Sequence, residues 1–128
     1  MLSVKKITIS LLSITLLFSC NSKKAIAVIE KPLLSLDTVM IGESKSTSFS
    51  IKNIGNELLQ IEKFNCSCEC TVPELKENTV VKPSDSINIR LTVKGYETDK
   101  GKWKQVLCTF KTNSDSIFTR LNVKYYTK

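Results

Sequence analysis

Three segments of the chain alternate between apolar and polar side chains. They cover residues 46–52, 86–94 and 117–125, where apolar positions recur at a spacing of two along most of the segment. Successive side chains of a β-strand point to opposite faces of a sheet, so this spacing buries one face and leaves the other in water. The positions that we expect to point inward are Thr47, Phe49, Ile51, Ile87, Ile89, Leu91, Val93, Ile117, Leu121, Val123 and Tyr125.

Weaker apolar runs occupy residues 34–40, 58–64, 79–82 and 103–111. Turn-forming residues separate the runs at 42–43, 53–56, 83–85, 95–101 and 113–115. No segment carries the sustained apolar stripe of an amphipathic helix. Six or seven short strands in about 97 residues predict an all-β fold, an immunoglobulin-like antiparallel sandwich of about seven strands. A barrel is the structural alternative.

The N-terminus has the pattern of an export signal. Lys5 and Lys6 precede an apolar run over residues 7–18, which is shorter than the ~20 residues of a membrane-spanning helix. The run ends at Cys20 in a sequence, Leu-Phe-Ser-Cys, that resembles the bacterial lipobox, in which the cysteine is lipidated and the chain is cut before it. We therefore expect residues 1–19 to be a lipoprotein signal peptide and Cys20 to carry lipid. The alternative is an ordinary secretory signal with an unrelated cysteine.

The residues after the signal predict where the mature protein resides. Residues 20–31 are expected to be the lipidated N-terminus and a short tether, and residues 32–128 the folded domain. In related lipoproteins, an acidic cluster after the cysteine resembles a signal for export to the cell surface. The segment 20–24 lacks such a cluster. The expected location is the bacterial cell envelope, with the domain anchored to the outer membrane through Cys20 and facing the periplasm.

The order of turn residues and strands resembles the bacterial lipoprotein family catalogued as domain of unknown function 1573. The residues that carry the resemblance are Gly42-Glu43, Asn53-x-Gly55, Leu59-x-Ile61, Cys68-x-Cys70-Thr71, Pro83, Gly101-x-Trp103 and Asn113. The resemblance covers roughly residues 33–125 and implies an immunoglobulin-like fold, similar to the cilia- and sperm-associated modules that pack against protein partners. Glu69 and Ser84 stand where the family usually has glycine, and Cys66 is an additional cysteine.

Four cysteines are the only candidate chemistry in the predicted domain. Cys66, Cys68 and Cys70 fall within five residues, whereas Cys108 lies far along the chain. Exported proteins meet an oxidising compartment, and four cysteines allow three complete pairings. Cys108 shares a strand face with Val106 and Phe110, so it is expected to point inward, and only a loop cysteine that folds over the core can bond to it.

Four interpretations of these cysteines remain open at the level of sequence. The first is a structural disulfide, as small secreted domains often have. The second is a thiol–disulfide exchange site, because a short ring is easily reduced. The third is a soft-metal site for Cu(I) or zinc on Cys66, Cys68 and Cys70, since thiolates suit those ions. The fourth is a set of free thiols without a role.

Charge and composition narrow the functional classes. The chain has no histidine and a net charge of +7, of which +5 remains after removal of residues 1–19. Without histidine there is no Ser-His-Asp or Cys-His pair, and four glycines offer no phosphate-binding loop. Residues 100–128 carry an excess of basic side chains, because Asp115 is the only acidic residue of that segment. This excess of positive charge either contacts anionic lipid head groups or keeps the strand surfaces soluble. A nucleic-acid-binding surface is rejected, because an envelope protein has little access to nucleic acid.

The sequence thus predicts a non-catalytic, lipid-anchored domain that needs no cofactor and binds another protein or serves as an assembly module. Its partners are the membrane, through the lipid on Cys20, and a protein. The alternative is a thiol redox or soft-metal-binding lipoprotein that uses the loop of Cys66, Cys68 and Cys70.

Overall fold

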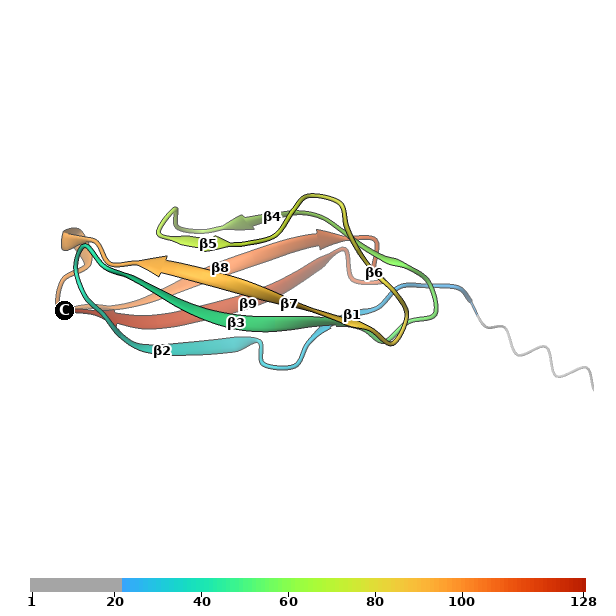
Figure 1. Cartoon of the computed structure of the whole chain (residues 1–128), viewed down its shortest axis with the longest axis horizontal. Coiled ribbons are helices and arrows are strands. Elements are labelled where there is room, and N and C mark those ends of the chain that lie inside the picture. The colour runs from blue at the N-terminus through green and yellow to red at the C-terminus, as the bar shows by residue number, and fades with distance from the viewer. Residues whose placement is uncertain (1–21) are drawn as a thin grey trace, which may run out of the picture.

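A computed structural model describes residues 22–128 (Figure 1). The expected signal peptide and Cys20 lie outside the described residues. Within the described residues, nine strands and one short helix follow each other. They are β1 (Ala27–Ile29), β2 (Leu33–Val39), β3 (Ser44–Asn53), β4 (Leu59–Cys66), β5 (Thr71–Pro73), β6 (Thr79–Val81), β7 (Ser86–Lys94), the 3₁₀ helix η1 (Glu97–Asp99), β8 (Trp103–Thr112) and β9 (Phe118–Thr127). No helix within residues 22–128 is long and apolar enough to cross a membrane.

The strands form two sheets that pack face to face along the long axis of the domain (Figure 1). One sheet has four strands in the order β1-β3-β7-β5, and the other has five in the order β2-β9-β8-β4-β6. All neighbours are antiparallel except β2 and β9, which run parallel. The predicted all-β sandwich is therefore confirmed. The described part begins at one end of the long axis, and the C-terminus lies at the other (Figure 1).

The core lies between the sheets and is filled by the positions that alternate in the sequence. Ile89, Leu91 and Val93 of β7 are buried against Leu121, Val123 and Tyr125 of β9 and the inward side chains of β3 and β8. The largest fully buried side chains are Tyr125, Phe110, Ile51, Leu59, Ile61, Ile89, Leu91 and Leu121. Three expected core positions differ: Thr47 and Ile87 are only partly buried, and Ile117 is 55% exposed because it precedes β9 in the turn.

The domain begins earlier than residue 32, which corrects the predicted boundary. β1 pairs with β3, with Ala27 opposite Asn53, and Ala25 and Ile29 are buried in the core. The predicted tether therefore becomes part of the sandwich from about Lys24, whose carbonyl oxygen accepts hydrogen bonds from Asn56 and Glu57. A three-residue strand is too short to show a period of two, so the pattern gave no sign of it.

A second short strand, β5, was also missed. Its residues follow Cys70 and belong to none of the predicted apolar runs, but Thr71 pairs with Val93 of β7, and Pro73 pairs with Leu91. Proline donates no ladder hydrogen bond, yet β5 is an edge strand, where proline is tolerated. With β1 and β5 included, the described chain has nine strands rather than about seven.

Candidate functional site

The four cysteines of the domain form two disulfides. Cys66 ends β4 and lies directly opposite Cys108 of β8 in the register, and the two sulfur atoms are bonded. Their Cα atoms are 4.0 Å apart, so the bond ties neighbouring strands within one sheet. The side chain of Cys108 is fully buried, in the inward phase that it shares with Val106 and Phe110. This disulfide joins residues that are 42 positions apart in sequence and closes the segment that contains β5, β6 and β7.

The second disulfide joins Cys68 and Cys70 in the turn between β4 and β5. The backbone N–H of Cys70 also donates to the sulfur of Cys68 at 3.1 Å, and the N–H of Thr71 donates to the carbonyl oxygen of Cys68. This turn carries the chain from the five-stranded sheet to the four-stranded sheet. The carbonyl oxygen of Cys70 accepts from the N–H of Lys94 on β7, which fixes the turn against the second sheet. The disulfide therefore closes the point at which the chain crosses between layers.

The turn is also anchored through the core. The sulfur of Cys70 lies 3.1 Å from the hydroxyl oxygen of Tyr125, a fully buried residue of β9 in the opposite sheet. A sulfur in a disulfide has no hydrogen, so the tyrosine hydroxyl is the donor. Burial of the phenol, together with the negative charge of Asp99, raises the pKa of Tyr125 to about 12, so it remains a donor well above neutral pH. The contact links the turn to β9 across the sandwich.

This geometry favours a structural role for the cysteines. All four sulfur atoms are bonded in pairs, so the interpretation of free thiols is wrong, and no thiolate is left to hold a soft metal. Within residues 22–128, no group of three or more histidine, cysteine, aspartate or glutamate side chains is placed to bind a metal. Cys70 is almost fully buried, which hinders attack by another thiol on its sulfur, and Glu69 brings a negative charge beside the pair. The redox or metal alternative finds no support here.

The outer face of the five-stranded sheet is rich in cations and large apolar side chains. We call it the basic sheet face; it comprises the odd-numbered residues 103–111 of β8, the even-numbered residues 118–126 of β9, and their exposed neighbours Leu33 on β2 and Lys63 and Asn65 on β4. The register places Trp103 beside Tyr126, Leu107 beside Asn122, and Phe118 beside Lys111. Leu33 lies on the other side of Asn122. Three of the residue pairs that lie opposite each other on β8 and β9 therefore include a large apolar side chain.

The outer face of the four-stranded sheet has a different character. Along β3 and β7 it presents short hydroxyl and amide side chains, with Ser46 opposite Thr92 and Ser50 opposite Asn88. The hydroxyls of Ser46 and Thr92 are 3.2 Å apart, and Arg90 donates to Ser46. We call this surface the serine-rich face. Its one large exposed apolar side chain among the described strands is Val72 on the edge strand β5.

Sequence reasoning located part of this arrangement. It found all four bonded cysteines and the inward phase of Cys108. The expectation that only a loop cysteine could bond to Cys108 is wrong, because Cys66 lies on the neighbouring strand β4 and its pairing depends on the register of β4 against β8. The ladder between them shifts between Ile61 and Lys63, and this shift decides that Cys66 meets Cys108. The contact of Tyr125 with Cys70 was missed: alternation marks Tyr125 as buried but does not reveal what it meets across the core.

Residues 27–125 match the model of a family described as "Protein of unknown function (DUF1573)". No curated protein matches the chain. Among solved structures, a protein of unknown function from Porphyromonas gingivalis W83 is similar, with a TM-score of 0.66 and 17% identity over 83% of this chain. The aligned part is 48% of that protein, so this chain spans about half of its length.

Two further solved structures extend the comparison. The seventh PapD-like domain of human CEP192 has a TM-score of 0.67 at 6% identity, and the match covers 82% of this chain and 87% of that domain. A chain of the CsuC–CsuE chaperone–adhesion subunit complex of Acinetobacter baumannii has a TM-score of 0.58 at 13% identity, covering 81% and 53%. At these identities the likeness concerns the fold, which is immunoglobulin-like and PapD-like.

Proposed function

Because the chain belongs to the DUF1573 family of proteins of unknown function, we propose its role from its own surface: it is a lipid-anchored envelope domain that binds another protein and does no catalysis. The sandwich is the binding platform, and the two disulfides stabilise it. The lipid on Cys20 keeps it at the outer membrane, facing the periplasm.

The observation that carries this proposal is the number of large apolar side chains that lie outside the closed core. Those that are at least half exposed are Leu33, Ile54, Leu58, Val72, Val80, Trp103, Ile117 and Phe118. Scattered apolar residues are normal on a protein surface, whereas apolar residues gathered on one face mark interaction sites. Leu33, Trp103, Leu107 and Phe118 belong to the basic sheet face. A tryptophan that is 60% exposed on a sheet face favours burial against a partner.

The similar structures support the same class of function. One neighbour is a PapD-like domain, and another comes from a complex of a pilus chaperone with an adhesion subunit. The chaperone complex favours a protein-binding module, but other similar structures are two Vibrio cholerae proteases and a xyloglucanase, and a shared fold alone does not determine function. The two disulfides also suit an exported protein, since oxidising compartments preserve them.

The binding function is tested with a photoreactive amino acid in the full chain, expressed in the organism of origin. It replaces Val72, Val80 or Leu107, one at a time, and covalent adducts are identified by mass spectrometry after illumination. We expect a defined protein adduct from at least one position. Absence of protein adducts at all three would contradict a protein-binding role.

The anchor is tested separately by intact-mass analysis of protein extracted from membranes. We expect a mature chain that starts at Cys20 and carries acyl chains, and we expect Cys20→Ser to remain unlipidated. Several acyl chains are needed for stable attachment, because one chain alone binds a membrane only marginally. A mature N-terminus at Asn21 or beyond would refute the anchor. Digestion of the domain by protease added to intact cells would refute the periplasmic orientation.

A further inference from the structure

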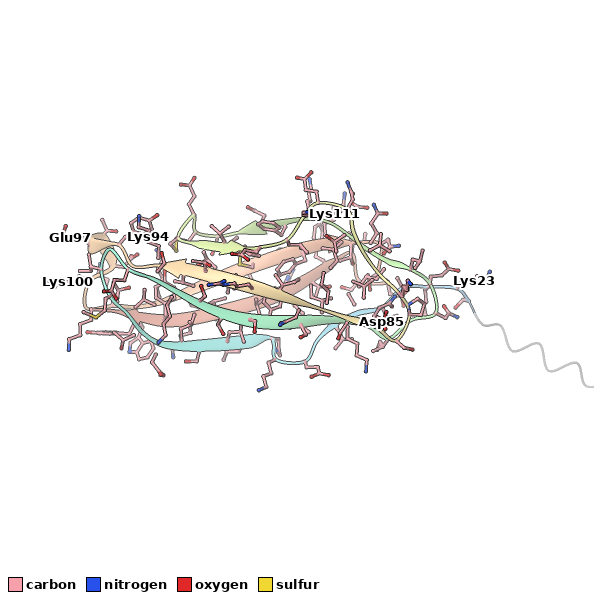
Figure 2. The ribbon with its side chains drawn as sticks, viewed as in Figure 1. Lys23, Asp85, Lys94, Glu97, Lys100 and Lys111 are labelled. Atoms are coloured by element: carbon pink, nitrogen blue, oxygen red, sulfur yellow. A yellow bond between two sulfur atoms is a disulfide. The ribbon has the colours of Figure 1, made fainter. Side chains whose placement is uncertain are left out.

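The basic sheet face carries cations that the described domain does not neutralise. Lys63, Arg120 and Lys124 are exposed, and none of them belongs to an ion pair within residues 22–128. Lys111 is the one cation of the face with an acidic partner, Glu62, at 3.3 Å. The side chain of Lys111 lies at the C-terminal end of β8, to which this residue belongs (Figure 2). The face therefore presents a positive surface that a negatively charged partner would complement.

The face combines this charge with an aromatic pair at one end. The rings of Trp103 and Tyr126 have centroids 5.5 Å apart, and the ammonium nitrogen of Lys124 lies 5.0 Å from the centroid of the Trp103 ring. The pair is held by neighbouring strands, so little side-chain freedom remains to be lost on binding. Tryptophan, tyrosine and arginine are the residues that most often dominate protein interfaces. Trp103 is thus suited to act as an anchor, with Lys124 beside it and Arg120 further along β9, opposite Thr109.

The dimensions of the face fit a protein surface. From Phe118 to Tyr126 it extends about 27 Å along β9, and its four strands make it about 15 Å wide. This area of about 400 Å² is roughly half of the ~800 Å² that each partner buries in a standard interface, so it matches a weak or transient contact. Between the cations lie amide and hydroxyl groups that can hydrogen-bond, with Gln105 donating to Asn122 at 3.3 Å. Polybasic membrane-binding segments instead concentrate their lysines.

A second copy of the chain would fit this face poorly. Two such faces brought together would oppose cation to cation, and like charges at an interface cost binding energy. The serine-rich face of a second copy is also basic, through Arg90, Lys94 and Lys52. Charge complementarity therefore selects a different molecule.

We propose that the basic sheet face docks an acidic surface of a folded envelope protein, with Trp103 as the apolar anchor and Arg120 and Lys124 as the charge-reading residues. This assignment rests on the protein-binding function proposed above and adds the face and the charge of the partner. The interaction weakens as salt rises, because exposed charges are screened beyond about 8–10 Å at physiological ionic strength.

The first step of the test locates the contact. The full chain carries a photoreactive residue in place of Leu107 on the basic sheet face or, as the matched control, in place of Ser48 on the serine-rich face. We expect a protein adduct from position 107 and none from position 48, with the cross-linked peptide on an acidic surface. Adducts only from position 48 or 72 would overturn the face assignment and leave the binding function intact. Adducts from none of the positions would overturn both.

The second step measures affinity between the purified partner and the full chain. Arg120→Glu with Lys124→Glu should weaken binding by at least about tenfold. Arg90→Glu with Lys94→Glu makes the same change of net charge on the serine-rich face and should change binding less than about twofold. Both pairs of positions are exposed, and unchanged melting temperatures confirm intact folds. Equal weakening by the two variants would overturn the proposal in favour of a general charge effect.

The third step separates a protein partner from a lipid surface. Phosphatidylglycerol vesicles are mixed with the full chain and with the Arg120→Glu, Lys124→Glu variant. We expect the two chains to bind the vesicles alike. Vesicle binding that the variant loses, without any protein adduct at position 107, would overturn the proposal and assign the face to the membrane.

Discussion

The amide of Asn53 makes hydrogen bonds to backbone groups from three parts of the chain. Its oxygen accepts from Ile26 and Gly55, and its nitrogen donates to the carbonyl oxygens of Glu57 and Val81 at 2.7 and 3.0 Å. The side chain is fully buried at the end of β3. One residue thereby joins the N-terminal segment, the turn after β3, and the edge strand β6.

Replacement of Asn53 should reveal the cost of losing this junction. Asn53→Ala removes the partner of four backbone groups, of which one hydrogen bond is buried and three are partly buried, and each buried unsatisfied group costs about 1–3 kcal/mol before relaxation and water entry. We expect the free energy of unfolding in urea to fall by about 3 kcal/mol. Asn88→Ala is the matched control: Asn88 is exposed on β7, and its loss should cost within about 0.5 kcal/mol. Similar losses at the two positions would contradict the role of Asn53.

The buried phenol of Tyr125 gives stability a dependence on high pH. Its pKa is raised from 10.0 to about 12, first by burial and then by the charge of Asp99. The folded state therefore favours the neutral phenol, and its stabilisation is complete below pH 10 and is lost as pH rises towards 12. We expect wild-type unfolding free energy to decline over this window more steeply than that of Tyr125→Phe, in urea titrations at several pH values. Parallel curves for the two proteins would rule out this contribution.

At the scale of the element, the sequence pattern located the long strands and the short strand β6, predicted as the run 79–82, but it missed two other short strands, β1 and β5. β3, β7 and β9 have nine or ten residues each, enough for a period of two to be visible. β1 and β5 have three residues each and follow from tertiary contacts rather than from a local pattern. The register shift in β4 has no local signature either, so the sequence could not predict that Cys66 is the partner of Cys108.

The packing of the N-terminal segment against Gly55 tests the corrected domain boundary. A Cβ atom at Gly55 would clash with the carbonyl oxygen of Lys24 and would lie 2.7 Å from the nitrogen of Ile26. Because both contacts are backbone, Gly55→Ala must displace the strand, and we expect a loss of about 1–3 kcal/mol in unfolding free energy. Faster hydrogen exchange of β1 should accompany it. A neutral substitution would mean that residues 24–29 are a tether after all.

The two disulfides should differ in their contribution to stability. The Cys66–Cys108 bond closes a loop of about 40 residues, for which the chain-entropy model gives about 4 kcal/mol, whereas the short Cys68–Cys70 ring gives about 2 kcal/mol. We expect Cys66→Ala with Cys108→Ala to lower the unfolding free energy more than Cys68→Ala with Cys70→Ala does. Non-reducing peptide mapping of the wild type establishes the pairing. A larger loss for the Cys68–Cys70 variant would contradict this order.

At the scale of the whole molecule, the sequence showed an excess of positive charge in residues 100–128 but not its distribution. Lys100 lies at the end of the molecule opposite Lys23 (Figure 2), and Lys104 pairs with Asp99 at 2.9 Å. Arg120 and Lys124, by contrast, share one sheet face with Lys63 of β4. Only the pairing of β8 with β9 and β4 converts a linear charge excess into a surface. Fold class was thus predictable from alternation, whereas the candidate binding surface required the topology.

The central claim, that a protein covers the basic sheet face in the cell, is tested most directly by lysine labelling. An amine-reactive reagent is applied to native envelopes and to the purified full chain, and modification of each lysine is quantified by mass spectrometry. Lys63 and Lys124 lie on the basic sheet face, and Lys94, which is also exposed, lies on the serine-rich face. We predict that labelling of Lys63 and Lys124 falls at least about twofold in the envelope while that of Lys94 is unchanged. Equal labelling of all three lysines in both preparations would contradict the account.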